Sequence, residues 1–350
     1  MDAELTMKVK DAARGAGADL VGIASLDRFE GAPKQWDPRY IFPDAKALIT
    51  LAFRIPRGVY RGAEEGTHFW QYPALGYANI NEVAAPMALR GLMIYLEDLG
   101  YEAAGIRNCG DTGPWSCISF QGDGLAGDKK IGDGGWFGRV SHTRPVKPDL
   151  PAPDVQFHFR IAAYLSGLGE IGFSKIFLTP QFGPRQRFAF CLTDAPLVAD
   201  PIYDGPPICD RCMACVKECP GALSATETVK VTVAGRELEW SRLDEGQCWM
   251  AYASGLSEVN PFLPPDALKD IPDGEKIMKG EKKVTIAEAF EVLKRVREHY
   301  PMVPPNSYYP AMCNGRGCMR ACMVHLEQKG RLENKFHEKF RKKTPWWHGK

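Results

Sequence analysis

The sequence predicts an α/β domain over residues 1–200, followed by a cysteine-rich module over residues 201–330. Two observations predict the α/β domain. Apolar residues repeat at helical spacing over residues 5–16, and a short apolar run at 20–24 is typical of a buried strand. Such alternation of helices and strands is characteristic of an α/β domain. A third observation defines the module, because eight of the eleven cysteines lie beyond residue 208.

The same patterns continue along the first domain. The further expected elements are, in chain order, a strand at 47–53, a helix at 89–99 ended by Gly100, a helix at 158–166, an apolar run at 175–179 and a strand at 188–193. Residues 105–154 are rich in glycine and proline, so few regular elements are expected there. Loops of this length are usually functional or mobile. The last segment, residues 331–350, is expected to be a basic tail.

Composition and charge narrow the possible partners. The chain has 44 Lys and Arg against 43 Asp and Glu, a net charge of +1, so no overall field attracts nucleic acid or acidic lipid. Its first 25 residues lack the charged start and apolar core of an export signal. No apolar run reaches the roughly 18 residues needed to span a bilayer. We expect a cytoplasmic protein that acts on a small-molecule substrate.

The most specific motif is the run CDRCMACVKECP at 209–220, in which cysteines follow the spacing C-x2-C-x2-C-x3-C-P. This is the bacterial ferredoxin spacing, in which three cysteines hold one 4Fe-4S cluster and the fourth ligates a second cluster. We therefore predict a ferredoxin-like module with two clusters and an insertion at 249–312. The crossed arrangement assigns Cys209, Cys212, Cys215 and Cys322 to the first cluster, and Cys219, Cys248, Cys313 and Cys318 to the second.

The second group of cysteines is less regular than the first. Cys313, Cys318 and Cys322 are spaced more widely than in ferredoxins, and Met323 stands where proline is usual. The alternatives are a zinc site or buried thiols, but zinc takes four ligands and not eight in crossed sets. Within the insertion, the capping-box pattern that starts at Thr285 predicts a helix that runs to about residue 300.

Three segments resemble a known family. They are GADLVGIASLDRF at 17–29, FPDAKALITLAF at 42–53, and AAYLSGLGEIGFSKIFLTPQFGPRQRFAFCLTDAPL at 162–197, which leads into the cysteine module. The chain resembles the corrinoid-dependent reductive dehalogenases and the related epoxyqueuosine reductases over most of residues 1–325. The resemblance implies a nitroreductase-like, corrinoid-binding domain that holds base-off cobalamin beside two 4Fe-4S clusters. It also implies that the clusters reduce the cobalt, for which low-potential clusters are suited.

The resemblance also implies a set of corrinoid-binding residues. By itself the turn GLGEIG indicates only that the backbone approaches something closely, and a helix-to-strand connection without a ligand is the alternative. In the family context the turn would lie against the macrocycle, and arginines downstream would meet its amide or phosphate groups. The residues so implied are Gly167, Leu168, Gly169, Gly172, Thr179, Arg185 and Arg187.

Two features favour the dehalogenase-like branch. Epoxyqueuosine reductases usually have GLGWIGKN, whereas this chain has Glu170 in the turn and Phe173-Ser174 after it. They also have a D-T-x5-R stretch upstream of the turn. Here Arg160 takes the place of the arginine, but Pro153 stands at the aspartate position and Asp154 follows it.

A reductive cleavage consumes a proton, so an acid is expected above the cobalt. Asp154 lies nearest the family's donor position, and Tyr164 offers a phenol of the kind that dehalogenases use. Loop capping and core packing are the respective alternatives. His158, Cys109 and Cys117 are weaker candidates.

We therefore expect a cobalamin-dependent iron–sulfur oxidoreductase that cleaves a small organic substrate, for example an organohalide. Its electrons would come from a low-potential donor such as ferredoxin or flavodoxin. Three alternatives stay open: an epoxyqueuosine reductase-like tRNA-modifying enzyme, a reductase that binds FMN instead of a corrinoid, and a ferredoxin-type electron-transfer protein with no substrate of its own.

Overall fold

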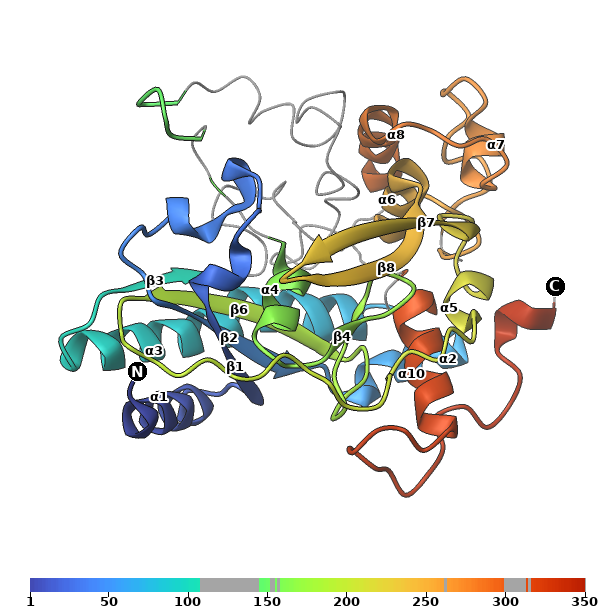
Figure 1. Cartoon of the computed structure of the whole chain (residues 1–350). Coiled ribbons are helices and arrows are strands. Elements are labelled where there is room, and N and C mark those ends of the chain that lie inside the picture. Colours follow the sequence, from blue (N-terminus) through green and yellow to red (C-terminus); the bar gives the residue numbers. More distant parts are fainter. Residues whose placement is uncertain are drawn as a thin grey trace.

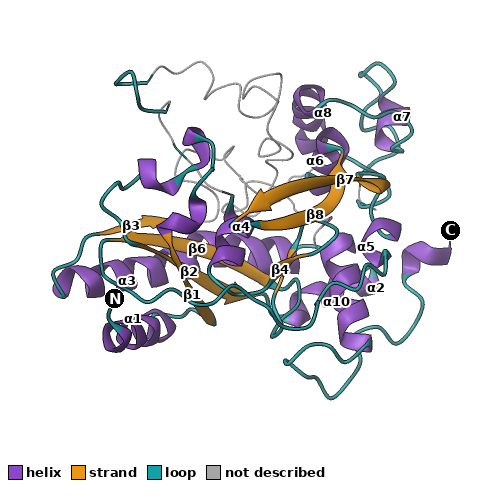
Figure 2. Ribbon diagram, viewed as in Figure 1, coloured by secondary structure: helices purple, strands orange, loops and turns teal. Residues whose placement is uncertain are grey.

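The computed structural model describes residues 1–107, 145–151, 155, 158–260, 263–298, 313 and 316–349. Figures 1 and 2 show a sheet flanked by helices, beside which lies the part of the chain that carries the cysteine module. Asp154, Cys109 and Cys117 lie outside the described residues.

Four strands form the central sheet, in the order β1-β2-β6-β3. They are β1 (Leu20–Ser25), β2 (Ala47–Arg54), β6 (Gln186–Thr193) and β3 (Ala103–Ile106), and each pair of neighbours is antiparallel. The mixed helix-and-sheet class expected from the sequence is confirmed, and the strand pairing shows an antiparallel arrangement. Strands β1, β2 and β6 match the predicted strands within two residues.

Helices cover both faces of this sheet. Helices α1 (Ala3–Gly15) and α3 (Ala85–Asp98) pack on one face, and α4 (Phe159–Leu165) packs on the other. Successive residues of a strand point to opposite faces, so Ile49 joins the core under α1 and α3 whereas Leu48 joins the core under α4. The sheet is therefore buried on both sides.

Shorter elements connect these layers. They are the 3₁₀ turns η1 (Leu26–Phe29), η2 (Lys34–Trp36), η3 (Pro38–Tyr40) and η4 (Arg57–Tyr60), helix α2 (Arg61–Glu65), the π-helical turns η5 (Tyr72–Ala78) and η6 (Ile80–Ala84), and the small strands β4 (Glu170–Ile171) and β5 (Phe177–Leu178). The turns η5 and η6 lead directly into α3. The apolar run expected at 175–179 is β5.

The cysteine module contains a hairpin and several helices. Its elements are α5 (Ala214–Lys217), strands β7 (Leu223–Val233) and β8 (Arg236–Leu243), α6 (Glu245–Tyr252), α7 (Gly274–Met278), α8 (Ile286–Glu298), α10 (Cys318–Gln328) and the 3₁₀ turn η10 (Trp346–Gly349). The predicted capping box is present at α8, where Thr285 N donates to Glu288 Oε2 over 2.8 Å and Glu288 N donates to Thr285 Oγ1 over 3.3 Å.

The segment expected to be a basic tail is packed onto the rest of the chain. Phe340 is buried, Trp346 Nε1 donates to the carbonyl of Ala63 over 3.0 Å, and the Trp346 ring meets Phe69 edge to face. Its basic residues are used in these contacts, as Arg341 pairs with Glu64 at 2.8 Å. Among the helices of the described ranges, none combines the length and the apolar character that a membrane crossing requires.

Candidate functional site

The structure sorts the eight module cysteines around two cavities. Four of them line one cavity and will be called the first cysteine set: Cys209, Cys212, Cys215 and Cys322. The other four line a second opening, here called the main cavity, and form the second cysteine set: Cys219, Cys248, Cys313 and Cys318. These are the same two groups that the crossed ferredoxin arrangement assigns to two clusters.

Local geometry explains how one short run serves both cavities. Arg211 and Met213 have left-handed backbone, with φ of 53° and 61°, which turns the chain twice between Cys209 and α5. Backbone N–H groups point at the sulfur atoms, since Phe173 N lies 3.4 Å from Cys209 Sγ and Leu223 N lies 3.3 Å from Cys219 Sγ. N–H groups of this kind stabilise thiolates and cluster sulfur.

Helix α10 contributes one cysteine to each set. Cys318 and Cys322 are four residues apart, so they lie on the same face of the helix. The residue before the helix must be glycine, because a Cβ on Gly317 would lie 2.9 Å from both the carbonyl oxygen and the Sγ of Cys313. The helix therefore joins the two cavities through adjacent turns.

Burial makes these thiols poor acids when no metal is bound. It raises the pKa of Cys215 to about 11, and it raises the pKa of Cys248, Cys313, Cys318 and Cys322 well above 9.0. Neighbouring cysteines of the same set raise these values further. The four sulfur atoms of the second set, buried and repelling one another as thiolates, form a donor set that fits an iron–sulfur cluster, whose iron supplies the compensating charge.

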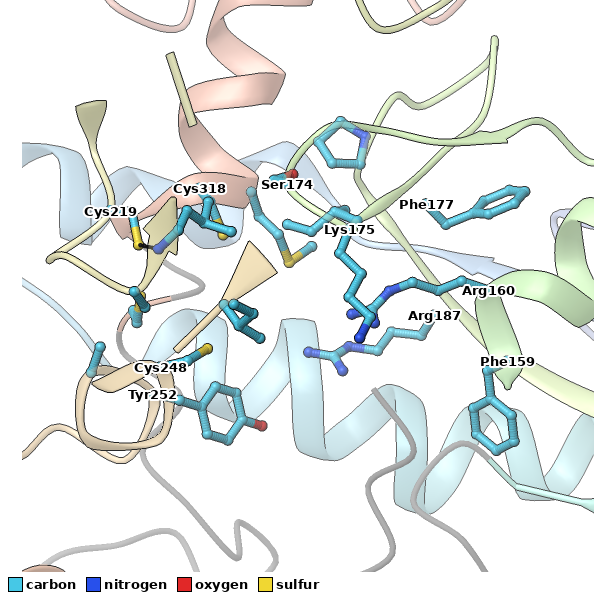
Figure 3. Close-up of a pocket in the computed structure, with 18 of the residues that line it drawn as sticks. Phe159, Arg160, Ser174, Lys175, Phe177, Arg187, Cys219, Cys248, Tyr252 and Cys318 are labelled. Carbon is cyan, nitrogen blue, oxygen red and sulfur yellow. Dashed lines mark hydrogen bonds between the residues drawn. The ribbon is translucent and has the colours of Figure 1, made fainter. Parts of the chain in front are cut away.

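The main cavity extends from the second cysteine set to a group of cationic side chains. Arg160, Lys175 and Arg187 line it, together with apolar residues such as Phe159 and Phe188. Figure 3 shows the labelled cysteines on one side of the pocket and the three cations toward the other. The cavity volume that the centre of a water molecule can reach is about 140 Å³. A single bound water needs only roughly 10–15 Å³ of such volume. The cavity therefore has room for a ligand.

Arg187 is held in place by aromatic residues of η5. Its Nη2 donates to Tyr72 Oη over 2.7 Å, its Nε donates to the carbonyl of Gly76 over 3.3 Å, and its guanidinium lies 4.2 Å from the centre of the Tyr77 ring. Tyr72 Oη also lies 3.6 Å from the sulfur of Met319, next to Cys318. The arginine is thus oriented in the cavity by three contacts with η5.

The glycine turn at 167–172 makes close approaches, but to protein backbone. A Cβ on Gly167 would lie 2.2 Å from the carbonyl oxygen of Pro201, and one on Gly169 would lie 2.0 Å from that of Leu178. Gly172 lines the cavity of the first cysteine set, and Leu168 packs in the core under α4. These contacts account for the small residues at 167 and 169 without a ligand, and contact of the turn with a macrocycle stays a prediction.

Of the other residues implied by the resemblance, one lines the main cavity and two lie elsewhere. Arg187 lines the main cavity, whereas Thr179 is buried and donates to Gln186 Oε1 over 3.2 Å. Arg185 is buried and donates to the Ile55 carbonyl and to Asn334 Oδ1. It therefore lies outside the lining of the main cavity.

Two candidate acid–base residues lie within the described chain. Tyr164 is buried in the core under α4 and does not line the main cavity. His158 does line it, and its Nδ1 accepts from Ile161 N over 3.3 Å at the start of α4. Burial, together with Lys175 and Arg160, holds the pKa of His158 well below 6.5, so the ring is neutral near pH 7.

The sequence analysis assigned no role in the site to two residues of this region, Glu170 and Lys175. Glu170 accepts from Cys209 N over 2.6 Å and so fixes the start of the ferredoxin-type run; burial raises the pKa of this carboxyl group. Lys175 is buried with a φ of 65° and approaches the Trp240 ring at 5.7 Å. Their motif positions were visible, but their contacts depend on segments distant in sequence.

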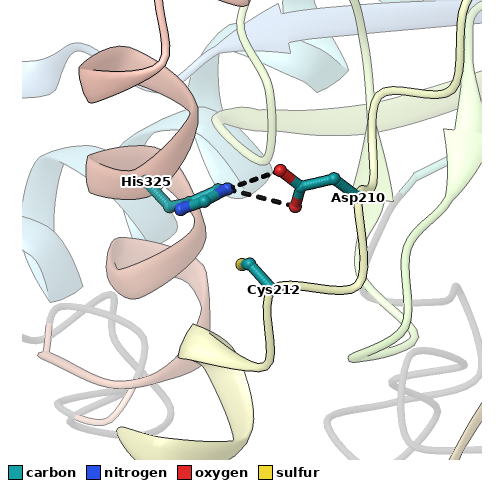
Figure 4. Close-up of side chains that lie close together, drawn as sticks. All are labelled: Asp210, Cys212 and His325. Atoms are coloured by element: carbon teal, nitrogen blue, oxygen red, sulfur yellow. Dashed lines mark hydrogen bonds and ion pairs between the residues drawn. The ribbon is translucent and has the colours of Figure 1, made fainter.

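Near Cys212 the surface carries a second feature. His325 Nε2 lies 2.8 Å from Asp210 Oδ2, and both side chains lie beside Cys212 (Figure 4). Cys212 is the one exposed cysteine among those that the structure describes. The first cysteine set is therefore the one nearer to solvent.

Comparisons with known proteins agree with the family resemblance. No protein-family model matches the chain. Among curated proteins, the tetrachloroethene reductive dehalogenase of Sulfurospirillum multivorans is 28% identical over 227 residues, which covers 62% of this chain and 40% of that protein. The chain thus spans well under half the length of this relative.

Solved structures of the same two groups are also similar. The catabolic reductive dehalogenase NpRdhA in complex with 3-bromo-4-hydroxybenzoic acid matches with 16% identity and a TM-score of 0.48, over 91% of this chain and 38% of that chain. An epoxyqueuosine reductase with a tRNA-Tyr stem loop matches with 14% identity and a TM-score of 0.43, over 94% and 83% of the two chains. The resemblance to reductive dehalogenases and epoxyqueuosine reductases inferred from the sequence is confirmed.

Proposed function

We propose that this protein is a corrinoid-dependent iron–sulfur reductase, in which two 4Fe-4S clusters deliver electrons to a cobalamin in the main cavity. The alignment with a reductive dehalogenase supports this proposal, since that relative is an oxidoreductase. A cytoplasmic location and a small organic substrate, for example an organohalide, belong to the same proposal. The FMN alternative gains no support from the comparisons.

One observation carries the proposal: the second cysteine set and three cationic side chains line the same cavity. A cluster held by these cysteines would be in direct reach of a ligand bound beside Arg160, Lys175 and Arg187. In the family context, electrons would pass from the first cluster to the second and then to this ligand. Since Cys212 is exposed, the first cluster would accept them from an external donor such as ferredoxin or flavodoxin.

The residues of the main cavity fit a corrinoid chemically. Phe159, Phe177 and Phe188 offer apolar surface to a flat macrocycle, and Arg160 and Arg187 can donate to its amide or phosphate oxygens. When bound, the corrinoid supplies a strongly reducing cobalt centre. The turn from Gly167 to Gly172, which the resemblance places at the macrocycle, contains β4 and would hold β5, and with it Phe177, at the edge of the cavity.

The cationic side chains would also act on the substrate. Reductive cleavage of R–X adds two electrons and one proton and releases R–H and X⁻. A positive charge fixed near the departing anion stabilises the transition state when the site excludes water. Arg160 and Lys175 are candidates for this role, because both line the cavity and their charges act on buried His158.

For the proton we propose Asp154, which the family resemblance places nearest the donor position. Tyr164, the rival, is buried in the core under α4. If Asp154→Asn retains cobalt reduction but loses turnover while Tyr164→Phe keeps both, the aspartate is the donor. Full activity in the asparagine variant would exclude it.

The proposal as a whole is tested by reconstitution. Anaerobically purified protein should contain about eight iron and eight sulfide per chain, as two cubane clusters require. Added cobalamin should give the paramagnetic resonance signal of base-off Co(II), and Arg187→Gln should weaken its binding while the iron content stays constant. A protein with full iron that binds flavin but no corrinoid would overturn the corrinoid assignment. If neither cofactor binds, the electron-transfer alternative is supported instead.

A further inference from the structure

A groove lined by arginines lies apart from both cysteine cavities. Arg54 ends β2, Arg57 lies in η4, Arg61 begins α2, and Arg185 precedes β6. The volume open to the centre of a water molecule is about 370 Å³, many times the roughly 10–15 Å³ that one water occupies on that measure. The groove therefore has room for a small organic molecule.

Positive charge dominates this groove. Among the described residues that line it, four are arginines and none is acidic. Among the described residues, Asp19 lies 3.5 Å from Arg54 Nε, Glu327 lies 2.7 Å from Arg57 Nη1, and the charge of Arg61 acts on Glu65 and helps to lower its pKa. Three acidic groups thus oppose four guanidinium groups, which leaves one positive charge in excess.

The arginines retain donor groups after their structural contacts are counted. Arg57 Nη1 donates to the Glu338 carbonyl and Arg61 Nη1 to the Phe340 carbonyl, which holds the C-terminal segment. Within the described part of the chain, no hydrogen-bond partner holds the Nε or Nη2 of these two arginines. The Nε of Arg185 is buried without a partner among the described residues. Several N–H donors of the groove thus have no acceptor among the residues that the structure describes.

Burial and neighbouring positive charges disfavour the charged form of Arg185. Its side chain is almost fully buried, and this burial lowers its pKa, which the charges of Arg54 and Arg57 lower further against the opposing effect of Tyr60 and Glu327. A buried cation with like charges beside it is destabilised unless an anion compensates it. A bound anion would supply that compensation.

We propose that this groove is a binding site for a small organic molecule that carries phosphate groups. Four guanidinium groups, from β2, η4, α2 and the residue before β6, line this one groove, and together they offer more N–H donors than the two oxygens of a carboxylate accept, which favours the several oxygens of phosphate groups. Phe336 completes the lining, is 37% exposed and packs against Arg57 at 3.5 Å, so it offers an apolar face to the organic part.

The site is separate from the proposed corrinoid site. Arg185 lines the groove, whereas Pro184 and Gln186 on either side of it line the main cavity. The two openings therefore lie on different sides of this segment. The inference goes beyond the proposed reductase activity and does not depend on it.

Calorimetric titration of the protein as isolated, at low salt, tests the site with inorganic phosphate and inorganic diphosphate as probes. Arg54→Gln is the informative variant, because Arg54 is 44% exposed at its side chain and its ion pair is with Asp19, whereas Arg57 and Arg61 donate to carbonyls of the C-terminal segment. Arg14→Gln is the matched control, since Arg14 is 51% exposed, pairs with Asp11 and lies on α1. Both substitutions remove one positive charge. Iron content is measured before and after, because diphosphate can extract iron.

Diphosphate is expected to bind at one saturable site per chain, and Arg54→Gln should weaken it roughly tenfold, the loss of about one charge-assisted hydrogen bond. Arg14→Gln should leave it unchanged. Absence of saturable binding, or equal weakening by both variants, would overturn the proposal. Citrate that binds as tightly as diphosphate would overturn the phosphate assignment. Displacement of diphosphate by added cobalamin would show that the groove is part of the corrinoid site and would also overturn it.

Discussion

Arg320 donates from Nη1 to Glu64 Oε2 over 2.6 Å and thereby joins α10 to α2 across 256 residues of sequence. Both side chains are buried, and the Trp347 ring lies 4.0 Å from the guanidinium. Figure 1 shows α2 beside α10. Since α10 supplies one cysteine to each cavity, this ion pair helps to position both cysteine sets.

Replacement of Arg320 by methionine should destabilise the protein by up to about 3 kcal/mol, because Glu64 and Glu218 are both buried and would keep Arg341 as their one cationic partner among the described residues. Anaerobic thermal unfolding measures the effect. The control is Arg295→Met, where the exposed pair with Glu298 contributes less than about 1 kcal/mol. Equal melting temperatures for the two variants would show that the buried network adds nothing.

Gly169→Ala should destabilise the fold by at least about 1 kcal/mol, since φ is 154° and the new Cβ would lie 2.0 Å from the Leu178 carbonyl oxygen. Gly15→Ala is the control, because α1 leaves open space at that position and the change should stay below about 1 kcal/mol. Urea unfolding compares them. If Gly169→Ala keeps wild-type stability and instead loses only corrinoid binding, the turn contacts the macrocycle after all.

Cys219→Ser should damage the cluster of the second set and leave that of the first, because Cys219 lines the main cavity although it continues the Cys209 run. Iron should fall from about eight to about four per chain. Cys209→Ser should give the converse spectrum, since Cys209 lines the other cavity. Electron paramagnetic resonance of the reduced proteins distinguishes them. Loss of the first cluster in the Cys219 variant would refute the crossed assignment.

The stability of the protein should fall as pH drops below about 6.5, the usual histidine pKa. Burial holds the pKa of His158 well below that value, so the unfolded chain binds a proton in a range where the folded protein does not. His158→Asn keeps an acceptor for Ile161 N and should flatten the profile. His337→Asn, at an exposed position, should not. Identical profiles for all three proteins would exclude His158 as the source.

Local patterns were sufficient for much of the fold. The helical repeat at 5–16 and the apolar runs at 20–24 and 47–53 predicted α1, β1 and β2, because burial of one face imposes a period that survives in the sequence. The antiparallel pairing of β2 with β6 could not be read in this way. It joins residues about 140 positions apart, as Ile49 pairs with Cys191, and no local period records such a partner.

The candidate site was also only partly predictable from the sequence. The cluster-binding role of Cys209, Cys212, Cys215 and Cys219 could be predicted from their spacing, because the few residues between them determine where the sulfur atoms can lie. The cations of the main cavity come from three separate segments, and only tertiary structure brings Arg160, Lys175 and Arg187 together. The glycines at 167–172 predicted a close backbone approach. Only the tertiary structure showed that Gly167 lies against the Pro201 carbonyl and Gly169 against the Leu178 carbonyl.

The sequence alone therefore determined which segments form helices or strands, how the cysteines group into two sets, and which family the chain resembles. These depend on periodicity and spacing, which act over a few residues. The tertiary structure alone decided that Arg187 faces the main cavity while Arg185 faces the arginine groove, and that the turn at Gly169 packs on Leu178. Side-chain direction and burial arise from contacts between distant segments, so no local pattern encodes them.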